Sequence, residues 1–299
     1  MTQSHDTLLR FLLPAAGVRG VAVSLDATWQ AIASRAHYPA AVSELLGEAS
    51  AAAALFTGHT KVEGRLSIQL RGTGPVRTLF AECTAHGGLR GIAHLSEASA
   101  PFTGNLQQLG SDALLAITIE NPALGHGEPM RYQGLVSLQA SRLDAAFEDY
   151  FHQSEQLPTR ILLACNATRA VGLMLQKLPG EEGDNDGFVR ASALFDTLGS
   201  EELLALPSAD IIHRLFHEES PELVASKPLR FACSCSRERV EGMLRSLGRN
   251  ETDAAVIAGE GTASITCEFC GQGYHFDASA VDQLFSTPDP THPPATSTH

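Results

Sequence analysis

Cys233-Ser-Cys235, followed after residues 236–266 by Cys267-Glu-Phe-Cys270, is the part of this sequence with the most specific chemistry. Zinc binds four thiolates in a tetrahedron, and two close cysteine pairs from separate turns supply that ligand set. The separation of the pairs is longer than in common zinc ribbons, and the first pair has one intervening residue rather than two. We still predict one zinc ion per chain, held by all four cysteines, because four free thiols would be unexpected in so small a segment.

The segment that carries these cysteines, residues 231–285, has few large apolar side chains. A domain of this size is near the limit at which a hydrophobic core alone maintains a fold. Structural zinc contributes on the order of 10–16 kcal/mol to such modules, so we expect the metal-free form to be largely unfolded. Metal-bound thiolates are also nucleophilic, so oxidants can attack them, and a disulfide within each close pair would release the metal. A purely structural zinc site is the alternative on chemistry alone.

The preceding residues 179–230, here called the acidic segment, differ in composition from their neighbours. They begin with Pro-Gly-Glu-Glu-Gly-Asp-Asn-Asp-Gly at 179–187, which indicates the start of a linker. Short amphipathic helices are predicted around 194–198 and 203–216. Because the segment has no evident core of its own, its apolar faces must pack on a neighbouring domain. At the other end of the chain, proline and threonine predict a disordered tail over 286–299.

Residues 1–178 are predicted to form one mixed domain of helices and strands. Leu66, Ile68 and Leu70 alternate with polar residues, which is typical of a half-buried strand. The order of the elements favours the α+β class over repeated βαβ units. The expected elements are a helix over 39–56, strands over 66–70, 76–81, 114–119 and 135–138, a loop over 121–130, and helices over 143–151 and 161–175.

The overall charge limits the classes of partner. The formal net charge is -13, from 34 acidic and 21 basic residues, so neither nucleic acid nor an anionic membrane is an expected partner. None of the three lysines follows glycine, so the ATP-binding loop Gly-Lys-Ser/Thr is absent. The apolar run over 11–18 is too short to span a bilayer and is not followed by a signal-peptide cleavage pattern. We therefore expect a cytoplasmic protein, where paired cysteines more often indicate metal or redox chemistry than a disulfide framework.

Other candidate sites have weaker patterns. His213 and His217 lie four apart on a predicted helix but lack the glutamate of a His-Glu-x-x-His metal site, so we interpret them as surface residues. His152, Ser154 and Glu155 are close in sequence, which does not by itself make a nucleophile and base. The isolated cysteines at 83 and 165 are interpreted as small buried apolar residues. An enzyme is therefore not expected. The remaining alternative is a zinc-ribbon adaptor for nucleic acid or protein, although residues 231–285 hold eight acids against four bases.

Over nearly its whole length, the sequence resembles the redox-regulated chaperones of the heat-shock protein 33 family, with no departure at the four cysteine positions. In the first domain the similar residues are Arg19-Gly20, His37-Tyr38-Pro39, Leu45-Leu46-Gly47-Glu48, Glu63-Gly64-Arg65, Arg131-Tyr132-Gln133-Gly134 and the run from Tyr150 to Thr159. In the last domain they are the run from Phe231 to Arg239, the run from Cys267 to Gly271, Tyr274 and Phe276.

This resemblance implies a chaperone that holds unfolding client proteins without ATP. In the reduced state zinc would keep the last domain folded, and the acidic segment would cover the first domain. The resemblance also implies the disulfide pairing: oxidation would join Cys233 to Cys235 and Cys267 to Cys270. Zinc would then leave, the last domain would unfold, and the acidic segment would loosen to expose apolar surface. The resemblance also implies a homodimer in the activated state.

Overall fold

The computed structural model describes residues 6–96, 101–123, 129–180 and 186–286. The chain divides into two compact units, Met1–Ala232 and Cys233–His299. Helices and strands occur together in both units, so the predicted α+β class is confirmed. Within the described ranges, no helix has the length and apolar character that crossing a membrane requires. The acidic run at 181–185 and the predicted tail over 287–299 lie outside the described residues.

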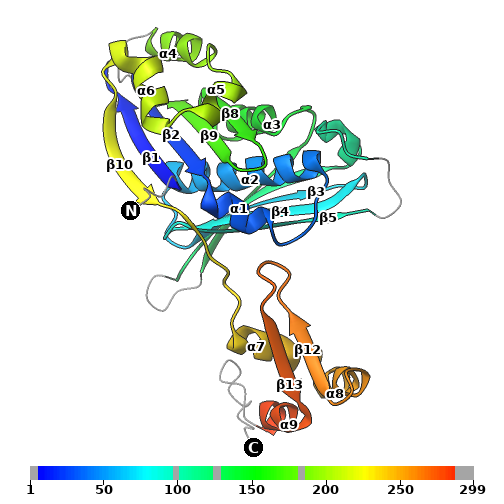
Figure 1. Ribbon diagram of the computed structural model, residues 1–299. Helices are drawn as coiled ribbons and strands as arrows, with labels where there is room; N and C mark the ends of the chain where they lie inside the picture. The colour runs from blue at the N-terminus through cyan, green and yellow to red at the C-terminus, as the bar shows by residue number, and fades with distance from the viewer. Residues whose placement is uncertain (1–5, 97–100, 124–128, 181–185, 287–299) are drawn as a thin grey trace, which may run out of the picture. The chain divides into compact units, whose positions relative to one another are not determined.

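The first unit contains a five-stranded antiparallel sheet with the order β10-β1-β2-β9-β8 (Figure 1). The outermost strand, β10, comes from the acidic segment and pairs with β1 from Thr7–Pro228 to Leu12–Glu222. The acidic segment therefore contributes backbone hydrogen bonds to this sheet as well as helices. The strands are β1 (Thr7–Leu13), β2 (Val18–Leu25), β8 (Thr159–Cys165), β9 (Ala170–Lys177) and β10 (Glu222–Pro228).

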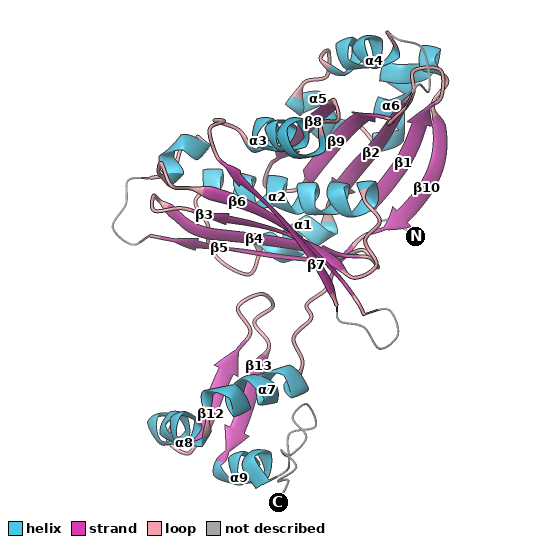
Figure 2. Ribbon diagram, turned by 180° about the vertical axis from the view of Figure 1, so that it is seen from behind, coloured by secondary structure: helices cyan, strands magenta, loops and turns pink. Residues whose placement is uncertain are grey.

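A six-stranded sheet with the order β11-β5-β4-β3-β6-β7 forms the second layer of this unit (Figure 2). Only the short β11 pairs in parallel, with β5. In β3 the side chains of Leu66, Ile68 and Leu70 are buried, as their alternation predicts. The strands are β3 (Arg65–Arg71), β4 (Val76–Thr84), β5 (Gly88–Leu95), β6 (Leu114–Asn121), β7 (Met130–Ser137) and β11 (Arg230–Phe231).

Helix α2 (Ala40–His59) lies between the two sheets and contacts both of them (Figure 2). Every residue from 49 to 56 is buried, which suits a helix that is apolar on all sides. Its alanines permit close approach of the sheets. Phe56 contacts Phe147 of α3 (Leu143–Tyr150) edge to face, with 4.8 Å between ring centroids, and Trp29 of α1 (Ala27–Ala33) completes this core.

Three helices of the acidic segment cover the other face of the five-stranded sheet (Figure 1). They are α4 (Gly187–Phe195), α5 (Ser200–Ala205) and α6 (Ser208–Phe216). We call the shared apolar layer the sheet–helix core; it includes Leu9, Phe11, Leu13, Val171, Leu173 and Leu175 from the sheet and Phe195, Leu203, Ile211, Leu215 and Phe216 from the helices. The prediction that the acidic segment packs its apolar faces on a neighbouring domain is therefore confirmed for these helices.

The second unit is small and has a core of its own. The buried apolar residues are Leu244, Val256, Ala263, Phe276, Val281 and Leu284. Its elements are α7 (Arg237–Leu247), α8 (Arg249–Ala258), the hairpin of β12 (Thr262–Thr266) and β13 (Gly273–Asp277), and α9 (Ala278–Ser286). Because so few apolar side chains are buried, much of the stability of this unit must come from a source other than its core.

The predicted helix over 161–175 is wrong, because this region forms strands β8 and β9 joined by a short turn. An apolar run that is buried on both sides has no alternation, so periodicity does not separate a strand from a helix there. Strands β1, β2, β5 and β10 were also not predicted. The helix over 39–56, the strands at 66–70, 76–81, 114–119 and 135–138, and the helix near 143–151 are confirmed, the last ending at Tyr150.

Three further short turns complete the described elements. They are η1 (Leu106–Leu109) and η3 (His217–Glu219), which are 3-10 turns, and η2 (Phe151–Glu155), a π-helical turn that continues α3. The predicted loop over 121–130 overlaps the ends of β6 and β7, and its residues 124–128 lie outside the described residues.

Candidate metal centre

The four predicted ligands lie on two irregular segments of the second unit. Cys233 and Cys235 precede α7, whose first turn is capped by the Ser236 hydroxyl accepting from the Arg239 amide. The Arg239 guanidinium also donates to the Ser234 carbonyl at 2.8 Å. These contacts fix the chain between the two cysteines relative to the helix.

The second pair lies on the turn between β12 and β13. The Cys267 amide donates to the Gln272 carbonyl at 2.9 Å, and the Gly271 amide donates to the Cys267 carbonyl at 2.8 Å. Gly271 has a φ of +73°, a conformation that residues with a side chain rarely adopt. A glycine directly after Cys270 therefore lets the turn close tightly enough to present both sulfurs on the same side.

The structure brings all four sulfurs together, and all lie within 4.8 Å of one another. The Cys233 and Cys267 Sγ atoms are 3.6 Å apart, and those of Cys235 and Cys270 are 3.3 Å apart. A zinc–sulfur bond of about 2.3 Å in a tetrahedron corresponds to sulfur separations of roughly 3.8 Å. The donor set and its spacing therefore fit a four-coordinate zinc ion, with no position left for a water ligand.

The electrostatics of the cluster also favour a cation. Desolvation, with the neighbouring thiols of Cys235, Cys233 and Cys267, raises the pKa of Cys270 to about 12. Sulfurs so close together repel one another when ionised, and a divalent cation removes that penalty. A hydrogen bond to the Cys235 sulfur raises the pKa of Tyr274 to about 12. This contact was not predicted from the sequence, since no spacing rule connects position 274 to position 235.

The fold does not bring the other candidate residues named from the sequence into a reactive or metal-binding arrangement. His213 and His217 stack with 5.8 Å between ring centroids, but the cysteine cluster is the only group of three or more potential ligands found in the described ranges. Burial raises the pKa of the Cys83 thiol to about 12 and also raises that of Cys165. Both thiols are thus less reactive than an exposed cysteine. His152, Ser154 and Glu155 are exposed on η2.

The fold and the cysteine cluster define a two-unit α+β protein with a C-terminal group of four cysteines that could hold a metal ion. The family model described as Hsp33 protein matches residues 6–277, so the chain belongs to the Hsp33 family. It is 39% identical over 283 residues to a 33 kDa chaperonin of Nitrosococcus oceani, covering 95% of each chain. It is 41% identical over 289 residues to that of Pseudomonas aeruginosa, covering 95% of this chain and 96% of the relative.

A solved structure shares the fold. The 33 kDa chaperonin of Thermotoga maritima, described as a heat shock protein 33 homologue, superposes with a TM-score of 0.78 at 21% identity. The match covers 94% of this chain and 98% of that one. The likeness therefore includes the arrangement of the elements, well beyond the local cysteine pattern.

Proposed function

We propose that this chain is an oxidation-activated, ATP-independent holdase of the cytoplasm, which binds unfolding proteins and prevents their aggregation. The observation that carries the proposal is the sheet–helix core, in which three helices of the acidic segment cover a wide apolar face of the five-stranded sheet. That segment is followed almost immediately in the chain by the cysteine cluster, since Cys233 comes two residues after β11. The family membership, and the name chaperonin that its relatives carry, agree with this role.

In the quiet state the four thiolates would hold one zinc ion, which supplies a cross-link between the turn before α7 and the turn after β12. The described residues of the second unit include six buried apolar side chains, so this cross-link would provide most of the stability of the unit. With both units folded, Phe11, Leu13 and their neighbours stay covered by α4 and α6. Clients would then find little apolar surface on this face of the sheet.

In the active state each close pair would become a disulfide, Cys233 to Cys235 and Cys267 to Cys270. Two thiolates, two protons and one peroxide molecule give one disulfide and two waters, so each pair consumes one equivalent of oxidant. No thiolate would remain to bind a cation, and the second unit would lose its fold. The acidic segment would then detach, exposing the sheet face to clients, and the active form would be a homodimer. Neither a nucleic acid, a membrane nor a catalytic step belongs to this proposal.

The test compares reduced, zinc-loaded protein with peroxide-treated protein in a client aggregation assay followed by light scattering. A chromogenic chelator reports released zinc in the same sample. We expect suppression of aggregation to appear as zinc is released and to disappear after treatment with a thiol reductant. Zinc release without any gain in suppression would show that the site is structural only and would refute the redox switch.

A variant lacking the two other thiols provides the matched control. Cys83→Ala combined with Cys165→Ala leaves the metal cluster intact and removes both remaining cysteines. The switch should be retained in this variant, because burial already suppresses the reactivity of both thiols. If peroxide no longer activated the variant, the redox switch would lie outside the cluster.

A further inference from the structure

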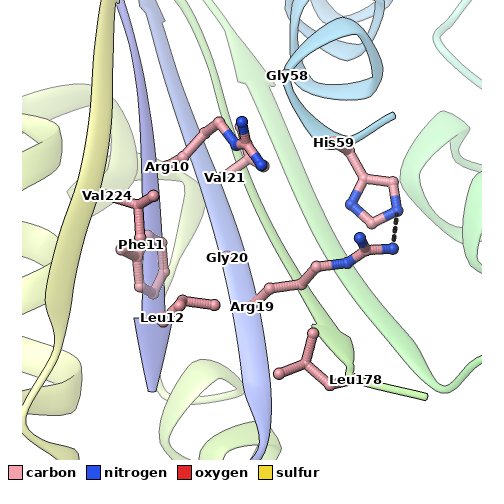
Figure 3. A pocket seen from close by; sticks show the side chains of 10 residues that line it. All are labelled: Arg10, Phe11, Leu12, Arg19, Gly20, Val21, Gly58, His59, Leu178 and Val224. Carbon is pink, nitrogen blue, oxygen red and sulfur yellow. Dashed lines mark hydrogen bonds between the residues drawn. The ribbon is translucent and has the colours of Figure 1, made fainter. Parts of the chain in front are cut away.

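A pocket of about 190 Å³ opens on the α2 face of the five-stranded sheet, at the C-terminal end of that helix (Figure 3). Its apolar walls include Leu12, Leu178 and Val224. Its polar groups are all basic, namely Arg10 from β1, Arg19 from β2 and His59 from α2. A basic lining is unexpected in a chain with a net charge of -13.

In the described part of the chain, the arginines of this pocket have no carboxylate partner. Neither Arg10 nor Arg19 forms an ion pair with an acid among the residues that the structure describes, whereas most other arginines do. Arg19 contacts neutral groups instead: its Nη2 lies 2.9 Å from His59 Nε2 and also donates to Gln176 Oε1. Its Nε is buried and has no hydrogen-bond partner. A buried donor without a partner is uncommon and indicates a group that this pocket could still satisfy.

The protonation state of His59 agrees with a positive electrostatic potential in the pocket. A guanidinium only donates, so His59 Nε2 accepts from Arg19 and the ring is neutral, with its proton on Nδ1. Burial, followed by the charges of Arg19 and Arg10, lowers the pKa of His59 to about 3. The C-terminal end of α2 carries roughly half a negative charge, which offsets only part of the two guanidinium charges. Among the residues that the structure describes, no acid lines the pocket, so its positive charge is left uncompensated.

We propose that this pocket binds a small organic oxyanion, whose charged oxygens bind Arg10 and Arg19 while its apolar part contacts Leu12, Leu178 and Val224. Guanidinium groups bind carboxylate and phosphate oxygens through charge-assisted hydrogen bonds. A small movement of the neighbouring side chains would let a ligand oxygen reach the buried Arg19 Nε and supply its missing acceptor. An engineered cavity of about 150 Å³ holds a benzene ring, so the present volume suits a compound of the size of benzoate.

The experiment uses the reduced, full-length protein at constant ionic strength, with benzoate as the probe and benzamide as its uncharged counterpart. Binding is followed through the ¹H–¹⁵N resonance of the Arg19 Nε–H group and by calorimetry. We expect saturable one-to-one binding of benzoate, a shift of that resonance and no saturable binding of benzamide. Inorganic phosphate serves as a third probe. Saturable binding of phosphate would show that the charged group alone suffices. If benzoate bound and phosphate did not, the apolar walls would contribute to binding.

Two variants identify the residues responsible. Arg10→Gln removes an exposed guanidinium, so folding should survive, and the affinity for benzoate should fall at least about tenfold. Arg77→Gln removes an exposed arginine on β4 that does not line the pocket and should leave the affinity unchanged. Equal weakening in both variants, equal binding of benzoate and benzamide, or no saturable binding of benzoate or phosphate would overturn the proposal.

Discussion

Replacing Phe216 with alanine should detach the acidic segment from the five-stranded sheet while the protein stays reduced. The Phe216 side chain is 0% exposed and stacks on Phe11 with 5.9 Å between ring centroids. Truncation of a fully buried phenylalanine costs about 3–5 kcal/mol through lost burial and the remaining cavity. Helix α6 has only nine residues and would not persist without this packing. Opening of the segment should therefore become on the order of a hundred- to several-thousand-fold more favourable.

Limited trypsin digestion measures this opening directly, since Arg190 and Arg214 lie in α4 and α6. When opening is fast relative to cleavage, the rate of proteolysis follows the population of the open state. We expect cleavage after both arginines to accelerate in reduced Phe216→Ala, with zinc retained, because the second unit has its own core. If the proposed holdase function is correct, this variant should also suppress client aggregation without peroxide.

Val189→Ala provides the matched control on the same segment. Val189 lies on α4 but is 67% exposed, so its truncation should change the unfolding free energy by less than about 0.5 kcal/mol. Its cleavage pattern should equal that of the wild type. If Phe216→Ala were cleaved at the same rate as Val189→Ala, the sheet–helix core would not hold the segment, and the reasoning would be refuted.

Three further perturbations have definite expected results. Cys235→Ser should abolish stoichiometric zinc binding, unfold the second unit and loosen the acidic segment, seen as lost amide protection in 233–286 and in β10 with protection of β2, β8 and β9 retained; protection throughout would contradict a metal-dependent fold. Burial, and after it the charge of Asp144, raises the pKa of Glu48 from 4.5 to about 8. The contribution of Glu48 to stability is therefore complete below pH 4.5 and is lost as the pH rises through 8. Glu48→Gln should therefore raise the Tm above pH 8 and leave it unchanged below pH 4.5; a constant difference would show another cause. Arg169 pairs with Asp26 at 2.7 Å and donates to the Leu204 carbonyl, so Arg169→Ala should lower the unfolding free energy by about 2 kcal/mol, measured by urea denaturation.

The clustering of the four cysteines was predictable from the sequence because its signal is local. Two close cysteine pairs can supply a tetrahedral ligand set whatever fold surrounds them, and the structure brings Cys233, Cys235, Cys267 and Cys270 within 4.8 Å of one another. Helix α2 was also predicted, because apolar residues recur over its whole length. Likewise, the alternation at 66–70 identified β3, since one of its faces is buried and the other is not.

Features that depend on distant partners were not accessible from the sequence. Residues 161–175 form two apolar runs separated by Asn166-Ala-Thr-Arg169, and only the pairing of these runs with each other and with β2 makes them strands. Strand β10 is largely exposed and far along the chain from β1, so nothing local indicates that it forms the sheet edge. The contacts between Arg19 and His59 join residues 40 positions apart.

The sequence by itself therefore determined the candidate ligand set, the charge and the class of fold, because cysteine spacing, composition and periodicity act over a few residues. Only the tertiary structure decided which surface the acidic segment covers and where uncompensated positive charge gathers. Both depend on which side chains meet across strands and helices that are remote in the chain. Burial, the resulting pKa shifts and the shape of a pocket all depend on contacts between residues that are distant in sequence, so no local pattern predicts them.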